Sequence, residues 1–259
     1  MEQDPTPVTA EIVNTTTICS TFPRFHSPQV NRDNFIHAFE EILGGEVDVL
    51  LVQGKEEIGK TTVLAQFARR HPDRCLSVFV RSSNRFSFDP AIVLSDLCNQ
   101  AHWLLFRREC PDQPPADESE LRRLLFELQR RARRTAGSFY FVFDGLAGLD
   151  QDASQFRQLV LSLLPIGSPG FKFLITGAET MLGGSLKGVP WKTFTLPGLT
   201  LDETAAYLQD FGLSSSAVNE LFRTFRGVPG RLASVRRLLE SGADAGALLD
   251  TPGCQTCSS

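Results

Sequence analysis

Short, almost wholly apolar runs recur along this chain, separated by longer segments with a different pattern. Four of them are apolar at nearly every position: 47–53, 75–81, 138–146 and 171–177. Strands that are buried on both faces have this composition, whereas strands with one face in water alternate apolar and polar residues. The segment 192–199, KTFTLPGL, predicts a fifth strand.

The segments between these runs place apolar residues three and four positions apart, which predicts helices. They cover residues 31–43, 60–71, 89–108, 118–134 and 153–164. Asp89 followed by Pro90 marks a helix start, because the carboxylate caps free N–H groups and proline fits the first turn. Strands that alternate with helices indicate a parallel sheet with right-handed crossovers, and therefore a three-layer α/β fold.

Only helical patterns follow residue 199. They cover 200–212, 214–227 and 228–241, and Thr200 with Glu203 forms a capping box at the start of the first one. The first residues of the chain are instead rich in threonine and proline, which is typical of a linker. The chain is therefore expected to have four parts: a linker at 1–24, an α/β core at 25–197, a small all-helical lid at 198–243 and a flexible tail at 244–259.

The motif with the clearest chemistry lies where the first predicted strand ends. Gly54 and Gly59-Lys60-Thr61 have the spacing G-x-x-x-x-G-K-T, directly after a buried strand and at the start of a helix. Glycines let the backbone curl so that successive N–H groups point at phosphate oxygens, and the helix dipole adds positive potential. In this interpretation Lys60 reaches the β- and γ-phosphates of a nucleotide, and the Thr61 hydroxyl binds Mg²⁺.

Carboxylates near this loop have two different expected roles. Glu56 and Glu57 lie inside the loop, and we expect their side chains to point to solvent, because only backbone N–H groups need to face phosphate. Asp144 ends the third predicted strand and is expected to hold Mg²⁺ through water, in preference to a simple Asp-Gly turn. The loop residues expected to contact the nucleotide are Gly54, Glu57, Ile58, Gly59, Lys60, Thr61 and Thr62.

Taken together, these motifs resemble the STAND signal-transduction ATPases, near the NACHT branch of the AAA-like P-loop proteins. FVFDGLAGLD is similar to the family's Walker B segment, and FLITGAE is similar to its sensor strand, with Thr176 at the sensor position. LPGLTLDETAAYL resembles the phrase that introduces the family's helical domain. The resemblance covers residues 24–241 and implies an ATP or ADP site with Mg²⁺, in which Lys60, Asp144 and Thr176 carry any hydrolysis.

Two further nucleotide contacts are implied by the resemblance alone. Gly227-Val228-Pro229 matches the family's Gly-x-Pro, whose proline lies against the adenine. Asn31-Arg32-Asp33 is the nearest match to the family's Gly-Arg-Glu motif, which precedes the phosphate-binding loop and lies near the nucleotide base. The resemblance also leads to a switch hypothesis, in which ADP holds the lid closed and ATP allows homo-oligomer formation, with effector and sensor domains fused or separate.

The chain departs from the family at positions that matter for hydrolysis. The family's second acidic pair falls on Ala147 and Gly148, and Gly177-Ala178 stand where the family often has an arginine. A general base contributes about 10²–10⁴-fold to such a reaction, so we expect hydrolysis to be slow or absent. Asp150 can replace the missing acidic residue only if a turn of the chain brings its carboxylate back to the site. The family's winged-helix and sensor parts have no counterpart in these 259 residues.

Composition narrows the expected partners and location. The net charge is −4, which argues against nucleic acid as a partner, and the arginines of 122–134 are interpreted as a solvated helix face. No apolar run approaches the ~18 residues of a membrane span, and the N-terminus lacks a signal-peptide pattern. The scattered cysteines favour a reducing cytoplasm; they are Cys19, Cys75, Cys98, Cys110, Cys254 and Cys257.

Three alternatives to the switch remain open at this point. The first is a nucleotide-loaded scaffold that does not switch. The second is an active enzyme, such as a small-molecule kinase or ATPase. The third is an oligomeric ATPase that acts on DNA. Phosphate release would identify the enzyme, and salt-dependent DNA binding would identify the third class. A redox or metal role for Cys254 and Cys257 is disfavoured, because no second pair accompanies them.

Overall fold

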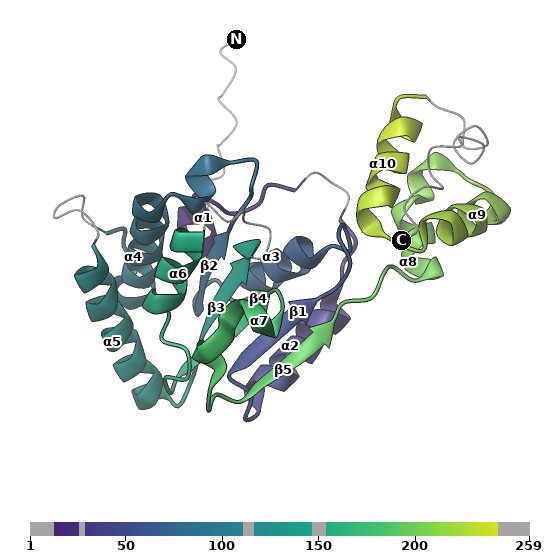
Figure 1. Ribbon diagram of the computed structural model, residues 1–259. Helices are drawn as coiled ribbons and strands as arrows, with labels where there is room; N and C mark the ends of the chain where they lie inside the picture. The colour runs from purple at the N-terminus through teal and green to yellow at the C-terminus, as the bar shows by residue number, and fades with distance from the viewer. Residues whose placement is uncertain (1–12, 26–28, 111–116, 147–153, 243–259) are drawn as a thin grey trace, which may run out of the picture.

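A five-stranded, all-parallel sheet in the order β2-β3-β4-β1-β5 forms the centre of the protein (Figure 1). The computed structural model describes residues 13–25, 29–110, 117–146 and 154–242. Its strands are β1 (Val49–Gln53), β2 (Cys75–Phe79), β3 (Phe139–Asp144), β4 (Phe171–Thr176) and β5 (Trp191–Thr195). All the predicted strands are therefore confirmed, and the fifth ends earlier than expected.

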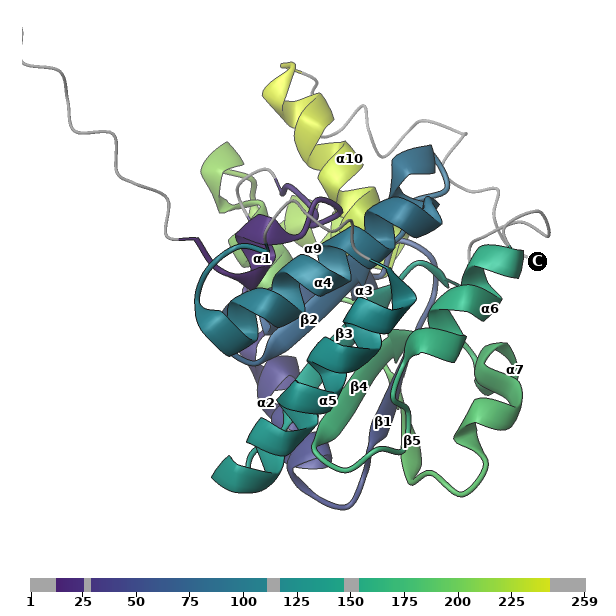
Figure 2. The same ribbon diagram turned by 90° about the vertical axis from the view of Figure 1, so that its left-hand side faces the viewer.

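Helices cover both faces of the sheet, which gives the predicted three layers (Figures 1 and 2). One layer holds α2 (Asp33–Gly44) and α3 (Lys60–Arg70). The other layer holds α4 (Pro90–Phe106), α5 (Glu118–Thr135), α6 (Ser154–Leu163), α7 (Glu179–Leu182) and the 3₁₀ helices η1 (Arg85–Phe88) and η4 (Gly183–Leu186). Among the described residues, no helix combines the length and the apolarity needed to cross a bilayer.

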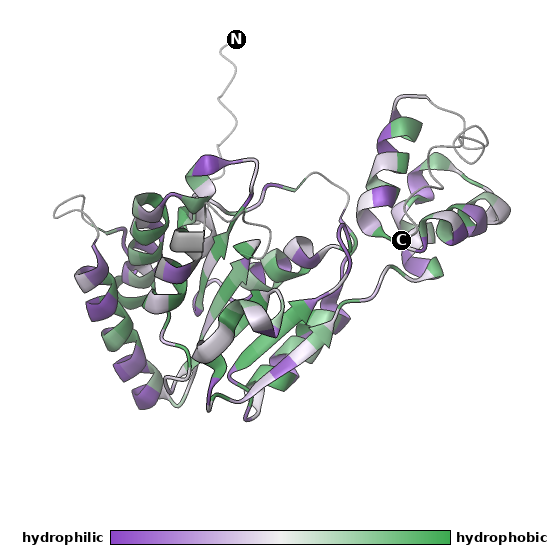
Figure 3. Ribbon diagram, in the orientation of Figure 1, coloured by the Kyte–Doolittle hydropathy of each residue, from purple (hydrophilic) through white to green (hydrophobic). Residues whose placement is uncertain are grey.

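Alternate residues of each central strand pack into opposite layers. Val49 and Leu51 of β1 belong to the core shared with α4 and α5, whereas Leu50 and Val52 belong to the core shared with α2 and α3. All four side chains are fully buried. Because neither face of the strand meets water, the whole run is apolar, and Figure 3 shows the sheet as a hydrophobic layer between helices.

A smaller helical unit follows the sheet. It consists of α8 (Leu201–Tyr207), the 3₁₀ helix η5 (Gln209–Phe211), α9 (Ser215–Phe225) and α10 (Pro229–Glu240). The unit has its own core, which includes Leu208, Leu221 and Leu232. The predicted capping box is confirmed, since Thr200 and Glu203 exchange hydrogen bonds between side chains and backbone N–H groups. We call this unit the lid.

Residues 14–22 pack against the core, so the prediction of a linker at 1–24 is wrong for this segment. It includes α1 (Thr15–Ile18), in which Thr15 is fully buried. The backbone N–H and the hydroxyl of Ser20 both donate to the Asp96 carboxylate of α4. Thr21 accepts a hydrogen bond from the Phe79 N–H of the edge strand β2. The polar composition that suggested a linker thus supplies hydrogen bonds to buried groups of the core.

We predict that deletion of residues 1–22 destabilises the protein far more than deletion of residues 1–12. The longer deletion removes buried Thr15 and Cys19 and leaves the Asp96 carboxylate without its donors. The expected loss in the free energy of unfolding is more than about 2 kcal/mol. Urea denaturation of the two truncated proteins measures the difference, and equal stabilities would contradict the packing described.

Candidate functional site

The loop between β1 and α3 curls back on itself at the carboxyl edge of the sheet. Gly54, Glu57 and Gly59 have positive φ angles of 151°, 59° and 90°, a region that L-residues rarely adopt. A Cβ on Gly54 would lie 2.9 Å from Ile58 Cγ2, so this position requires glycine. No side chain caps the start of α3 at Lys60, and its first N–H groups are therefore available to an anion.

The Lys60 ammonium lies within this loop. Its Nζ donates to the carbonyl oxygens of Gly54 at 2.9 Å and Lys55 at 2.8 Å. These acceptors are neutral, and charge-assisted bonds to phosphate oxygens are stronger. A polyphosphate that entered the loop would therefore compete well for this ammonium.

The Asp144 carboxylate joins three elements at the same edge. Its Oδ2 accepts from the Thr61 hydroxyl of α3 at 2.5 Å, and its Oδ1 accepts from the Thr176 hydroxyl of β4 at 2.8 Å. Thr176 Oγ1 in turn accepts from the Gly145 N–H at 3.0 Å. Because β4 lies between β1 and β3 in the sheet, the structure brings together Thr61, Asp144 and Thr176, which the sequence placed far apart.

The surroundings of Asp144 fit a magnesium ion. The residue is only 6% exposed, and in the described part of the chain its side-chain partners are two hydroxyl groups and no cation. Buried carboxylates are usually paired with a positive charge or a metal. Carboxylate and hydroxyl oxygens are ligands that Mg²⁺ accepts, with phosphate and water oxygens completing its octahedron. The described residues contain no group of three His, Cys, Asp or Glu side chains that could hold a metal ion, so such an ion would depend on oxygens from the nucleotide.

A cavity of about 820 Å³ lies on the Asp144 side of the loop. Besides Lys60, Asp144 and Thr176, the turn Arg81-Ser82-Ser83 lines it. The Ser87 hydroxyl fixes this turn, because it accepts from the Arg81 N–H at 2.8 Å and donates to backbone carbonyls. No sequence motif marks Arg81; only the pairing of β2 with β3 carries it to the edge beside Asp144.

A second cavity, of about 390 Å³, lies between the loop and the lid. It is lined by the predicted contacts Glu57, Ile58, Gly59, Lys60, Thr61, Thr62, Arg32 and Pro229, and also by Val30, Leu199, Tyr207 and Gly230. The lid touches the loop directly, since the Gly230 N–H donates to the Glu57 carbonyl at 3.0 Å. A Cβ on Gly230 would lie 2.6 Å from Glu57 Cβ, so only glycine allows this approach. Glu56 and Glu57 are both exposed, as expected.

Arg32 lines this cavity, and part of its guanidinium is buried without a hydrogen-bond acceptor from the described part of the chain. Its Nη2 donates to the carbonyls of Pro197 and Gly198, both at 3.1 Å, and Glu203 lies 3.9 Å away. The residue is only 3% exposed. Its Nε and Nη1 are buried and have no hydrogen-bond partner among the described residues. Burial lowers the pKa of Arg32, and the Glu203 charge opposes this shift. Buried donors without acceptors are costly, and the face of this guanidinium lies over the Phe35 ring, 4.4 Å from its centroid.

Some predicted residues fall outside the described part of the chain. Ala147, Gly148 and Asp150, which bear on the second acidic position, lie in the segment 147–153. Cys254 and Cys257 belong to the segment 243–259, which also contains the predicted tail.

Comparison with known proteins supports the fold. No family model matches the chain, and no curated protein matches its sequence. A Walker-type ATPase of Pyrococcus abyssi matches with a TM-score of 0.58 and 17% identity, over 84% of this chain and 69% of that one. At this identity the likeness shows the fold alone: an α/β P-loop NTPase fold with a parallel sheet and flanking helices.

Two weaker structural matches have TM-scores below 0.5 and carry no further argument. A STAND protein with a tetratricopeptide repeat sensor from Pyrococcus horikoshii has a TM-score of 0.42 and 17% identity, over 85% of this chain and 30% of that one. The ORC2 protein of Aeropyrum pernix has a TM-score of 0.48 and 14% identity, over 89% of this chain and 71% of that one. This chain thus spans less than a third of that STAND protein.

We predict that Gly145→Ala is much more destabilising than Gly188→Ala. Both glycines have positive φ, 83° and 75°, but a Cβ on Gly145 would lie 2.0 Å from the Val80 carbonyl oxygen, whereas nothing lies within 4 Å of one on Gly188. The control should lose about 1–2 kcal/mol of unfolding free energy from backbone strain. Gly145→Ala should lose at least about 2 kcal/mol more, because the backbone beside Asp144 must move. Urea denaturation measures both, and similar losses would refute the close approach.

Proposed function

We propose that this chain is a nucleotide-binding regulatory module of the STAND type, which binds ATP or ADP together with Mg²⁺. The observation that carries the proposal is the contact between lid and loop. The Gly230 N–H of the lid donates to the Glu57 carbonyl of the phosphate-binding loop, and the 390 Å³ cavity lies between the two. A nucleotide in that cavity would contact both parts, so its identity would bias the position of the lid.

Each part of the nucleotide has a matching set of residues. The loop N–H groups and Lys60 would hold the phosphates, and Thr61 with Asp144 would hold Mg²⁺, which would neutralise phosphate charge when bound. The adenine and ribose would occupy the smaller cavity, whose volume is in the range of small-molecule sites. There the base would lie against Pro229, and Arg32 lines the same cavity.

In the proposed switch, ADP keeps the lid on the loop and exchange for ATP releases it. A ligand at about a thousand times its Kd stabilises the state that binds it by about 4.1 kcal/mol, which is enough to control such an equilibrium. Release of the lid would expose surface for homo-oligomer formation in the cytoplasm. Effector and sensor domains, fused or separate, would respond to that change.

Slow or absent hydrolysis is part of the proposal. In the described part of the chain, the carboxylates that line the 820 Å³ cavity are Asp144, Glu56 and Glu57. Asp144 would be occupied by the metal, and the other two belong to the exposed face of the loop. Without a placed general base, hydrolysis would lack a contribution of about 10²–10⁴-fold, and the bound nucleotide would persist as a signal.

Arg81 would supply the positive charge that Gly177-Ala178 do not. It lines the same cavity as Lys60, Asp144 and Thr176, and its turn is fixed by the Ser87 hydroxyl. The γ-phosphate is the part of ATP that ADP lacks, and it would extend from the loop toward this cavity. A guanidinium there would favour ATP over ADP.

We predict that Lys60→Ala lowers the affinity for both ATP and ADP by at least about 100-fold, because it removes the ammonium that faces the phosphates. Lys55→Ala is the matched control, since this neighbouring lysine is exposed and only its carbonyl contacts Lys60. Calorimetry with each nucleotide and Mg²⁺ measures the effect. If the unaltered protein gives no more heat than Lys60→Ala, the proposed nucleotide site is wrong.

We also predict that Arg81→Ala weakens ATP binding by about tenfold and leaves ADP binding unchanged, because the side chain would meet only the γ-phosphate. Arg85→Ala is the control, since Arg85 is an exposed arginine in the adjacent helix η1 and does not line the cavity. Titration with both nucleotides gives the two ratios. An equal loss for ATP and ADP would assign Arg81 a structural role instead.

A further inference from the structure

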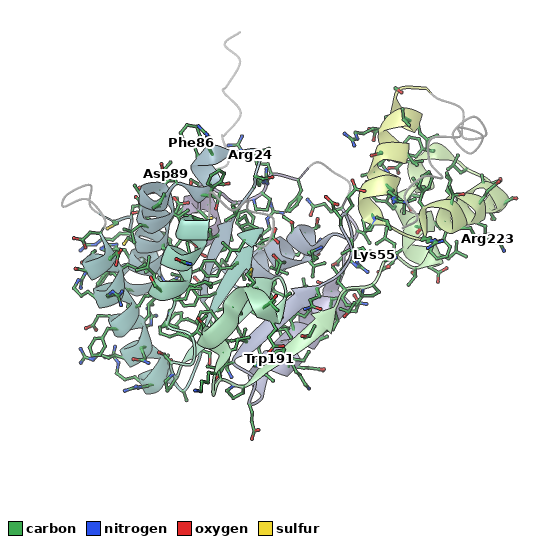
Figure 4. All side chains as sticks on the ribbon, viewed as in Figure 1. Arg24, Lys55, Phe86, Asp89, Trp191 and Arg223 are labelled. Atoms are coloured by element: carbon green, nitrogen blue, oxygen red, sulfur yellow. The ribbon has the colours of Figure 1, made fainter. Side chains whose placement is uncertain are left out.

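A third cavity, of about 590 Å³, lies at the junction of core and lid. The core contributes Gly54, Lys55 and residues 195–198, and the lid contributes residues 223–226, Val228 and Arg231. Figure 4 shows Lys55 on the core side of this junction and Arg223 on the lid side. We call this cavity the basic groove and define it by its four cations, Lys55, Arg223, Arg226 and Arg231.

The positive charge of the basic groove is not neutralised by the described part of the chain. No aspartate or glutamate lines the groove, and none of the ion pairs between described residues involves its four cations. The arginines of α5 behave differently, since Arg122, Arg123 and Arg130 each pair with a glutamate of the same helix. In a chain of net charge −4, such a groove is a local site for an anion.

The backbone holds this groove in a defined shape. Arg226 and Gly227 both have left-handed φ angles, 52° and 65°, and Arg226 adopts this strained conformation although it is not glycine. The Leu199 N–H donates to the Gly227 carbonyl at 2.7 Å. A Cβ on Gly198 would lie 3.0 Å from the carbonyl oxygens of both Arg226 and Gly227. The lid turn that carries Arg226 is thus packed tightly on the segment that follows β5.

The chemistry of the groove favours carboxylates on a peptide over a nucleic acid. Guanidinium and ammonium groups bind both carboxylates and phosphates. Single-stranded nucleic acids also need exposed aromatic faces on which bases stack, and the one aromatic side chain among the lining residues, Phe225, is 5% exposed. The exposed Thr195, Pro197 and Thr224 instead suit an extended backbone with small apolar side chains.

We propose that the basic groove binds a short acidic peptide segment of a partner protein and thereby strengthens ADP binding. The second half of this proposal rests on the proposed function. Gly54 lines both the basic groove and the 820 Å³ cavity, and Ile58 lines both the basic groove and the 390 Å³ cavity. A peptide that bridges core and lid stabilises the docked lid, and by linkage it raises ADP affinity as much as ADP raises peptide affinity.

The test uses the full chain and a short fluorescent peptide of glutamates with interspersed alanines. Fluorescence anisotropy should show binding that weakens with salt and is absent for the same peptide with glutamine in place of glutamate. Arg223→Gln with Arg226→Gln should weaken binding by about tenfold. Arg122→Gln with Arg130→Gln removes the same charge from α5 and should leave binding unchanged. Saturating ADP should raise peptide affinity by about fivefold or more.

Each outcome decides one part of the proposal. Equal affinity for the glutamate and glutamine peptides, or an equal loss in the two double variants, overturns the groove as a peptide site. Tighter binding of an oligothymidylate that is lost only in Arg223→Gln with Arg226→Gln assigns the groove to nucleic acid and overturns it as well. Peptide binding that ignores ADP, in a protein that binds ADP by calorimetry, overturns the coupling alone. ADP binding without the peptide is measured separately, so failure of the nucleotide site is distinguishable from failure of the groove.

Discussion

The arrangement of the candidate site depends on one buried carboxylate. Asp144 accepts hydrogen bonds from the hydroxyls of Thr61 and Thr176 and so connects α3, β3 and β4. The strand order brings these three residues together, because β4 lies between β1 and β3 and all three strands end at the same edge of the sheet. A buried carboxylate that has hydroxyl partners and no cation among the described residues retains acceptor capacity. The same group therefore both stabilises the edge of the sheet and leaves room for a metal ion.

A second buried charged group, Arg32, connects the core to the lid. Its Nη2 satisfies the carbonyls of Pro197 and Gly198, where the chain passes from β5 to the lid, and Glu203 of α8 lies nearby. Arg32 also lines the smaller cavity. A ligand in that cavity would lie against the side chain that connects the core to the lid. Ligand binding and lid position would then be coupled through a single residue.

The three cavities share their walls, which matters for regulation. Gly54 lines both the basic groove and the 820 Å³ cavity, and Ile58 lines both the basic groove and the 390 Å³ cavity. Both residues belong to a loop whose φ angles and close contacts leave little freedom to adjust. A ligand that displaces one side of such a loop would also displace the other side, because closely packed backbone moves as a unit. Partner binding and nucleotide binding would therefore be linked without a large rearrangement of the core.

The strands of the core, its longer helices α2 to α6, the capping box and the loop after β1 could all be predicted from the sequence. These features are local: a strand buried on both faces must be apolar throughout, and a loop that curls around phosphate needs its glycines and lysine at a set spacing. The composition of residues 14–22 predicted a linker. This prediction failed because serine and threonine there form hydrogen bonds with distant groups, the Asp96 carboxylate and the Phe79 N–H. The fold alone brings Arg81 beside Asp144, buries two donors of Arg32 without a partner among the described residues, and gathers four cations between core and lid. Those arrangements follow from strand order and from the docking of the lid. Both bring together residues that are far apart in the chain, so no local pattern in the sequence predicts them.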